Sequence, residues 1–141
     1  MLTKGFTLLE MLVVLVIIGL LAGLVAPQFL GEIDNAKRQT AEAQIKMLKN
    51  SISALYLDIG RYPTSEEGLK LLSSPPMDEN SKPFWKGPYL DEDLPLDPWN
   101  TAYQYSVPGK NGRPFALYSL GADKQLGGTD NNEDIGYLPP Q

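Results

Sequence analysis

Residues 11–27 read MLVVLVIIGLLAGLVAP, a run of 17 residues without a charge. Extending the run back to Phe6 adds only Thr7 and Glu10 as polar interruptions and gives a segment of 22 residues. As an α-helix with a rise of about 1.5 Å per residue, this segment is roughly 33 Å long, close to the roughly 30 Å hydrocarbon thickness of a bilayer. The sequence therefore predicts a transmembrane helix at the N-terminus.

Two other interpretations of the apolar run fit it less well. A helix buried in a soluble core needs apolar surroundings on all sides, and the 114 residues after Pro27 are too few to enclose it. A secretory signal peptide has a shorter apolar region of about 7–15 residues and a more basic start than the single Lys4 here, although Ala22-Gly23 or Ala26 offers a cleavage position. Length and composition together favour a membrane helix.

The composition narrows the possible functions. The 141 residues suffice for one domain. The chain has 17 acidic and 12 basic residues, and its net charge of −5, without a basic stripe, argues against nucleic acid as a partner. Cysteine and histidine are both absent, which excludes disulfides, thiolate metal sites and every catalytic triad that contains a histidine.

Glu10 stands inside the apolar segment. A carboxylate there costs on the order of 3 kcal/mol on insertion scales, so it needs a partner or a function. It ends the sequence Gly5-Phe6-Thr7-Leu8-Leu9-Glu10, which directly precedes the apolar run. This pattern resembles the class III leader of type IV pilins and pseudopilins. The alternative is a solvated residue at the membrane boundary, near Lys4.

The resemblance implies how the N-terminus is processed. In these families a membrane peptidase cleaves after the glycine, here Gly5, and methylates the new N-terminus, here Phe6. Residues 1–5 are then a leader peptide, and residues 6–27 form the transmembrane and filament-core helix. The Glu10 carboxylate is expected to pair with the Phe6 amine of a neighbouring subunit, because such a pair is favoured in a low dielectric over either charge alone.

An amphipathic pattern follows the membrane segment. Apolar residues at spacings of three and four predict a helix face that packs on a core, and they are Ala41, Ile45, Leu48, Ile52, Leu55 and Ile59. Pro27 predicts a kink or a local loss of helix over residues 23–27. Gly60 is a typical end signal. A long helix from Phe6 to Ile59 is expected, with residues 28–60 as its amphipathic half.

Residues 61–141 are expected to form a small globular α+β part. Thr64 and Glu67 match a capping box, which predicts a short helix over residues 65–73. Residues 75–98 hold six of the twelve prolines and are expected to form an ordered loop. Three aromatic residues are expected to hold this loop to the core: Trp85, Tyr89 and Trp99.

Two strands are predicted further along the chain. Residues 103–107 and 115–119 are rich in aromatic and β-branched residues, and a segment of turn-forming residues separates them. They are expected to form an antiparallel hairpin that packs on the amphipathic helix. The tail, residues 137–141, is expected to be loose.

An acidic loop lies after the hairpin. Residues 123–135 contain four carboxylates, with glycines around them. Hard cations such as calcium take about six to eight oxygen ligands from such groups and from carbonyls. The loop is not an EF-hand, because the spacing of the acidic residues differs, and the spacing alone leaves a solvated acidic turn as an equal alternative. Beyond residue 62 the chain has 12 acidic and 6 basic residues, so a bound cation would relieve repulsion.

Several motifs run along the soluble part of the chain. They are Gly60-Arg61-Tyr62-Pro63-Thr64 with Glu67-Gly68-Leu69, Asp97-Pro98-Trp99, Tyr103-Gln104-Tyr105, Ser119-Leu120-Gly121-Ala122-Asp123 and Glu133-Asp134-Ile135-Gly136. Together they resemble the major pseudopilin family of the type II secretion system, over nearly the whole mature chain. The resemblance implies a pilin-like α+β fold, in which a long N-terminal helix packs on a small C-terminal domain with a short antiparallel sheet and a calcium loop.

The resemblance also implies calcium as a cofactor. The ligands implied by motif position are the side chains of Asp123, Asp134 and Glu133 and the carbonyl of Leu120. Asp130 and Asn131 stay open as further ligands, because the motifs do not fix the register between Lys124 and Asn132. Lys124 stands where glycine is common in relatives, and Glu133 where aspartate is common.

The implied function is that of a non-enzymatic structural subunit. It is anchored in the bacterial inner membrane with residues 28–141 in the periplasm, and it polymerises into a pseudopilus that drives the export of folded proteins across the outer membrane. The implied partners are further copies of the chain, minor pseudopilins, the prepilin peptidase, the inner-membrane assembly platform with its ATPase, and the outer-membrane secretin.

Two alternatives remain at this point. The first is a type IV pilin or competence pseudopilin, although such pilins commonly carry a cysteine pair near the C-terminus, which is absent here. The second is a membrane-tethered hydrolase with paired carboxylates. Its candidate residues, in a proline-rich loop where charges are usually solvated, are Asp91, Glu92, Asp93 and Asp97.

Overall fold

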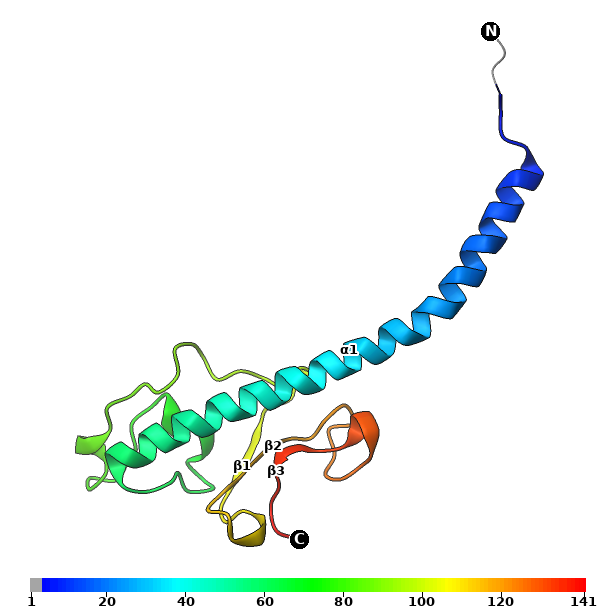
Figure 1. Cartoon of the computed structure of the whole chain (residues 1–141). Helices are drawn as coiled ribbons and strands as arrows, with labels where there is room; N and C mark the ends of the chain where they lie inside the picture. The colour runs from blue at the N-terminus through cyan, green and yellow to red at the C-terminus, as the bar shows by residue number, and fades with distance from the viewer. Residues whose placement is uncertain (1–3) are drawn as a thin grey trace. The chain divides into compact units, whose positions relative to one another are not determined.

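The computed structural model describes residues 4–141 (Figure 1). The predicted leader therefore lies partly outside the described residues, since residues 1–3 are not among them. The chain divides into two compact units, the first ending at Ala36 and the second covering Lys37–Gln141.

One long helix, α1, covers Leu8–Ile59. It begins two residues later than predicted and ends, as predicted, before Gly60, whose φ of +76° is the left-handed conformation that often follows a helix. Pro27 predicted a kink or a local loss of helix over residues 23–27, and of these the loss of helix is wrong, because α1 continues through this residue. A proline removes a single amide donor, and the other hydrogen bonds of the helix remain.

The second unit is built on one face of α1. The buried helix residues are the predicted ones, Ala41, Ile45, Leu48, Ile52 and Leu55, while Ile59 is partly buried against the same core. The strands are β1 (Gln104–Ser106), β2 (Ala116–Ser119) and β3 (Ile135–Tyr137), in the antiparallel order β1-β2-β3. Figure 1 shows this sheet beside the cyan part of α1. The predicted hairpin and the α+β fold class are confirmed.

The third strand was not predicted. Its three residues are too few for a visible alternation, and they directly follow the acidic loop. Gly136, in the middle of β3, has a φ of +119°, and a Cβ there would lie 2.5 Å from the Leu117 carbonyl and 3.0 Å from the Ile45 side chain. Only glycine therefore fits at this position, where β3 closely approaches both β2 and the Ile45 side chain of α1. Of the tail that was expected to be loose, residues 137–141, Tyr137 lies in β3 and the Leu138 carbonyl accepts a bond of 3.1 Å from the Lys110 amide.

The described residues also form short 3₁₀ helices: η1 (Gly68–Leu72), η2 (Lys82–Phe84), η3 (Lys110–Gly112) and η4 (Asp130–Asn132). The capping box is confirmed, because the Glu67 amide donates to Thr64 Oγ1 at 3.1 Å and the Thr64 amide donates to Glu67 Oε2 at 2.9 Å. The short helix predicted over residues 65–73 is present, but it is a 3₁₀ helix and covers only Gly68–Leu72. Gly68 has a φ of +56°, which breaks the α-helical path directly after the cap, so only η1 forms.

The proline-rich loop is held by its aromatic residues, as predicted. Trp85 Nε1 donates to the Leu71 carbonyl at 2.8 Å, and the Tyr89 hydroxyl donates to Asp58 Oδ2 at 2.7 Å. Both side chains are partly buried and pack on the core, as does Trp99. Hydrogen bonds from the loop thus reach both η1 and the end of α1.

Candidate functional site

The start of α1 carries a second capping box. The Glu10 amide donates to Thr7 Oγ1 at 3.1 Å, and the Thr7 amide donates to Glu10 Oε2 at 3.0 Å. This pairing satisfies two amide groups that the first helical turn leaves free. The sequence contains its signature, Thr7-x-x-Glu10, which the prediction for Glu10 did not use. Glu10 is therefore a capping residue in the single chain, and both it and Phe6 are exposed.

Within the part of the chain that the structure describes, no other segment covers the apolar part of α1. Its most apolar stretch of 18 residues has a mean hydropathy of 2.9, and none of it is buried. Leu15 and Leu20 are each 66% exposed, and Ile18 is 57% exposed. This segment is apolar and exposed on all sides, and it is long enough to cross a membrane.

The acidic loop joins β2 to β3. Leu120 follows β2 directly, and Asp130 and Asn131 lie in η4. Within the residues that the structure describes, no group of three or more acidic side chains is arranged to hold a metal ion. The structure therefore does not bring together the predicted side-chain ligands, Asp123, Glu133 and Asp134.

Asp134 is nevertheless placed in an unusual way. Its Oδ2 accepts a bond of 2.7 Å from the Gly127 amide, but its Oδ1 is buried and has no hydrogen-bond partner among residues 4–141. A buried carboxylate oxygen without a partner is costly, and proteins rarely leave one unpaired. Asp123 Oδ1, by contrast, accepts a local bond of 3.1 Å from the Gln125 amide.

Backbone oxygens gather at the start of the loop. A Cβ on Gly121 would lie 2.9 Å from the Glu133 carbonyl oxygen and 3.1 Å from that of Asn131. The Asn131 carbonyl accepts a bond of 3.0 Å from the Ala122 amide. Lys124 has a φ of +58°, so the loop has the left-handed conformation at this position.

Arg38 ties the acidic loop to α1. Its guanidinium donates to the Asp130 carbonyl at 2.8 Å and lies 3.5 Å from the Glu133 carboxylate. The structure thus places the Glu133 side chain against a cation of the chain itself. No sequence signal marked Arg38, which lies 95 residues before its carboxylate partner.

Asp97, a candidate acid or base of the hydrolase alternative, is 2% exposed. Its Oδ1 accepts bonds from the Trp99 amide at 3.0 Å and the Thr101 amide at 2.8 Å, and its Oδ2 accepts from Ser119 Oγ at 2.8 Å. Ser119 Oγ in turn accepts from the Gly121 amide at 3.2 Å. Asp97 therefore joins the loop to the end of β2, and its bonds explain its burial.

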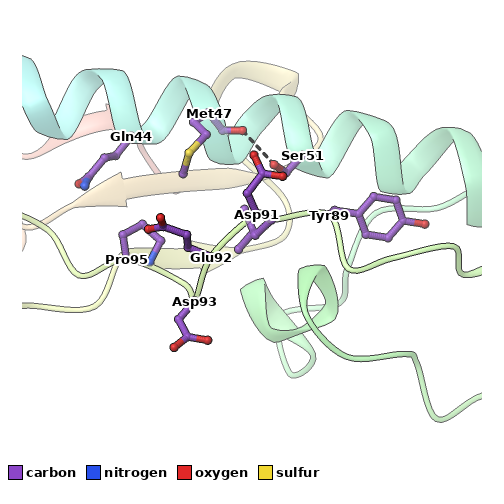
Figure 2. Close-up of a pocket in the computed structure, with 9 residues that line it drawn as sticks. Gln44, Met47, Ser51, Tyr89, Asp91, Glu92, Asp93 and Pro95 are labelled. Atoms are coloured by element: carbon purple, nitrogen blue, oxygen red, sulfur yellow. Dashed lines mark hydrogen bonds between the residues drawn. The ribbon is translucent and has the colours of Figure 1, made fainter.

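The other three hydrolase candidates, Asp91, Glu92 and Asp93, are exposed and line a groove of about 380 Å³ beside α1. Figure 2 shows Asp91 pointing toward the helix near Ser51, and Asp93 pointing away from it. Gln44 and Met47 form the helix side of the groove. Asp97 does not line it, so the four carboxylates do not form one site.

Arg61 organises a charged cluster where α1 ends. It pairs with both oxygens of Glu67 at 2.8 and 2.9 Å, with Asp78 Oδ1 at 2.7 Å and with Ser81 Oγ at 3.1 Å. Hydrogen bonds from Ser81 and from the Arg61 guanidinium lower the pKa of Asp78 to about 2. The Arg61 guanidinium also lowers the pKa of Glu67.

This cluster predicts an acid-sensitive contribution to stability. Both carboxyl pKa values are lower in the folded chain than in the unfolded chain, so the contribution is present above about pH 4 and is lost as the pH falls toward about 2. Replacing Arg61 with Met is expected to lower the Tm clearly at pH 7 and much less at pH 2.5. Thermal unfolding of the full chain in detergent, followed by near-UV circular dichroism, measures this difference. An equal loss at both pH values, or an effect no larger than that of Lys70→Met on the exposed side of η1, would contradict it.

Comparison with known proteins matches both ends of the chain. The family model described as "Type II secretion system (T2SS), protein G" matches residues 28–138, and "Prokaryotic N-terminal methylation motif" matches residues 1–26. The type II secretion system core protein G of Pseudomonas aeruginosa is 46% identical over 134 residues, covering 94% of this chain and 93% of that protein. The corresponding protein of Vibrio cholerae is 42% identical over 132 residues, covering 94% and 89%.

A solved structure agrees with these relatives. The crystal structure of the major pseudopilin from the type 2 secretion system of enterohaemorrhagic Escherichia coli is 33% identical, with a TM-score of 0.61 over 76% of this chain and 90% of that one. The fold and the N-terminal motif thus define a pseudopilin. The chain belongs to the type II secretion system protein G family. The family predicted from the sequence motifs is confirmed.

Proposed function

We propose that this chain is the major structural subunit of a type II secretion pseudopilus and has no catalytic role. The exposed apolar half of α1 carries the proposal, because it needs either a membrane or the helices of other subunits as its cover. The subunit is held in the inner membrane by residues 6–27, with residues 28–141 in the periplasm, and then enters the filament that drives export of folded proteins.

The partners follow from this assembly. The prepilin peptidase removes residues 1–5 and methylates Phe6. Other copies of the chain and minor pseudopilins form the filament, the inner-membrane platform and its ATPase supply the force, and the outer-membrane secretin is the exit. The methylation motif over residues 1–26 and the family match over residues 28–138 support this set of partners.

Cleavage at Gly5 tests the proposal. Replacing Gly5 with Ala is expected to leave the leader uncleaved and the N-terminus unmethylated, and so to stop assembly and export. Mass spectrometry of the membrane-extracted chain measures the retained mass of the five leader residues. Gly19→Ala, in the same apolar segment, is the matched control, since a Cβ at Gly19 meets nothing within 4 Å. Normal export by the Gly5 variant would overturn the function.

We further propose that the acidic loop binds calcium through Asp123 and Asp134, with Leu120 as a carbonyl donor. The buried, unpaired Asp134 Oδ1 and the carbonyl oxygens around Gly121 support this ligand chemistry. Glu133, Asp130 and Asn131 are the further candidates, and Glu133 would have to leave Arg38 to contribute its side chain. Calcium would supply positive charge among these oxygens and would link the loop to the end of β2.

Chelation tests the calcium proposal. Because an ion that binds only the folded state stabilises it, EDTA is expected to lower the Tm of the full chain by several degrees, and calcium is expected to restore it. Asp134→Asn is expected to remove this response. Asp91→Asn, outside the loop, is expected to keep it. An unchanged Tm with EDTA in the unaltered chain would overturn the proposal.

A further inference from the structure

Two cations converge on one exposed flank of the second unit. Lys49 Nζ lies 4.9 Å and Arg113 Cζ lies 4.6 Å from the centre of the Tyr137 ring, and Lys49 Nζ also donates to the Tyr137 hydroxyl at 3.4 Å. Both cationic side chains are exposed, and within residues 4–141 neither has a carboxylate within 4.0 Å. The Tyr137 ring therefore holds two positive charges close together without a carboxylate beside them, next to a small cavity of about 150 Å³. This arrangement favours an anionic group from outside.

The opposite charge lines the groove of Figure 2. Asp91, Glu92 and Asp93 are exposed on its rim, and in the described part of the chain none of them forms an ion pair. Met47, which is 43% exposed, and the partly buried Tyr89 give the groove an apolar floor. Such a surface suits the aliphatic stem and charged end of a lysine or arginine side chain.

The two surfaces lie on opposite flanks of α1. Met47, on the groove side, and Lys49, on the cationic side, are two residues apart, which is about 200° around a helix of 3.6 residues per turn. The core-facing residue Leu48 lies between them. The cations of one molecule therefore cannot enter its own groove, but they can enter the groove of a second copy. A contact between two different patches repeats from copy to copy and builds an open polymer.

We propose that Lys49 and Arg113 of each subunit pair with Asp91, Glu92 and Asp93 of the next subunit in the pseudopilus. The inference rests on the proposed function, since it names the surfaces by which the soluble units join in that polymer. Charge complementarity favours a second copy of this chain as the occupant of the groove, because that copy carries Lys49 and Arg113 together on the opposite flank of its own helix.

Cysteine cross-linking tests the pairing directly. The chain has no cysteine, so introduced thiols report only the chosen positions. With Lys49→Cys and Glu92→Cys in one full-length chain, expressed in its own bacterium in place of the native copy, mild oxidation is expected to give a ladder of covalent multimers. Each single variant is expected to give no ladder. Lys70→Cys with Glu92→Cys, which pairs the groove with an exposed lysine of η1, is the matched control and is expected to give none.

Charge exchange provides a second, independent test. Lys49→Glu with Arg113→Glu is expected to lower the yield of sheared filaments at least about tenfold, because like charges would then face each other. Changing Asp91, Glu92 and Asp93 to Lys is expected to do the same, and combining both sets is expected to restore filaments. Lys70→Glu with Lys82→Glu gives the same change of net charge and is expected to leave the yield unchanged. An unchanged Tm in all variants shows that the fold is intact.

The outcomes separate this pairing from the function beneath it. If the unaltered chain forms filaments but the cysteine pair gives no ladder and the exchanged charges do not restore assembly, the pairing is overturned and the function stands. A ladder that contains another protein instead of repeated copies also overturns it. If the unaltered, processed chain forms no filaments, the proposed function itself fails, and the pairing fails with it.

Discussion

Replacing Glu10 with Gln is expected to abolish pseudopilus assembly while leaving cleavage after Gly5 intact. Glutamine is also a capping-box residue, so it can keep the reciprocal bonds with Thr7 that the structure shows at 3.0 and 3.1 Å. It cannot supply the negative charge proposed to meet the Phe6 amine of a neighbouring subunit. Immunoblots of sheared filaments are expected to show a loss of at least about tenfold, since an unpaired amine in a low dielectric costs several kcal/mol.

Two variants separate the roles of the carboxylate. Thr7→Ala removes the hydroxyl that caps the Glu10 amide but keeps the charge, so it is expected to lower filament yield only mildly. Glu32→Gln removes an exposed charge further along α1 and is expected to have no effect. Normal filament yield from the Glu10→Gln chain would show that capping, and not charge, explains this residue.

The long helix and its core face could be predicted because their signals are periodic and local. Five of the six predicted stripe residues are buried, and the sixth, Ile59, is partly buried next to Gly60 at the helix end. The helix begins two residues later than its apolar pattern predicts, because Thr7 caps its first turn. The length of the apolar run and the helical spacing of the apolar residues therefore predict most of α1 without any knowledge of tertiary contacts.

Features set by tertiary contacts could not be predicted in this way. Strand β3 has only three residues, and its middle glycine is defined by the Leu117 carbonyl and the Ile45 side chain, which are distant in sequence. The salt bridge of Arg38 with Glu133 likewise joins residues that no motif connects. The cluster of carboxylates around Asp97 gave a reason to consider catalysis. The burial of Asp97 instead indicates a structural role.

In the acidic loop, the motifs predicted candidate residues but not how these residues are arranged. Motif positions named Asp123, Asp134 and Glu133 together, but the structure gives each carboxylate a different local environment: an amide of its own turn, a buried unpaired oxygen, and Arg38. A metal ion can rearrange a glycine-rich loop, because ligands must close around it. The structure therefore identifies the oxygens that a cation could use, and the EDTA experiment tests whether they bind one.

Replacing Asp97 with Ala is expected to destabilise the second unit strongly. It removes the acceptor of two amides and of the Ser119 hydroxyl, and it leaves these donors buried at the junction of the loop and β2. Hydrogen bonds to a charged group contribute about 1.5–3 kcal/mol each, and unpaired buried donors add to the cost, so a loss of at least about 3 kcal/mol is expected. Thermal unfolding of the full chain is expected to shift down by roughly 10 °C or more.

The conservative variant distinguishes charge from hydrogen bonding at this position. Asp97→Asn keeps one carbonyl oxygen for the Trp99 and Thr101 amides and loses the acceptor for Ser119, so it is expected to recover about half of the lost Tm, since two of the three bonds survive. Asp93→Ala, four residues earlier and exposed, is the matched control and is expected to leave the Tm unchanged. Ser119 Oγ also accepts a hydrogen bond from the Gly121 amide, at the start of the acidic loop. Asp97→Ala is therefore further expected to weaken the calcium response. A Tm within about 2 °C of the unaltered chain would show that solvent replaces these bonds and that Asp97 does not hold this corner of the fold.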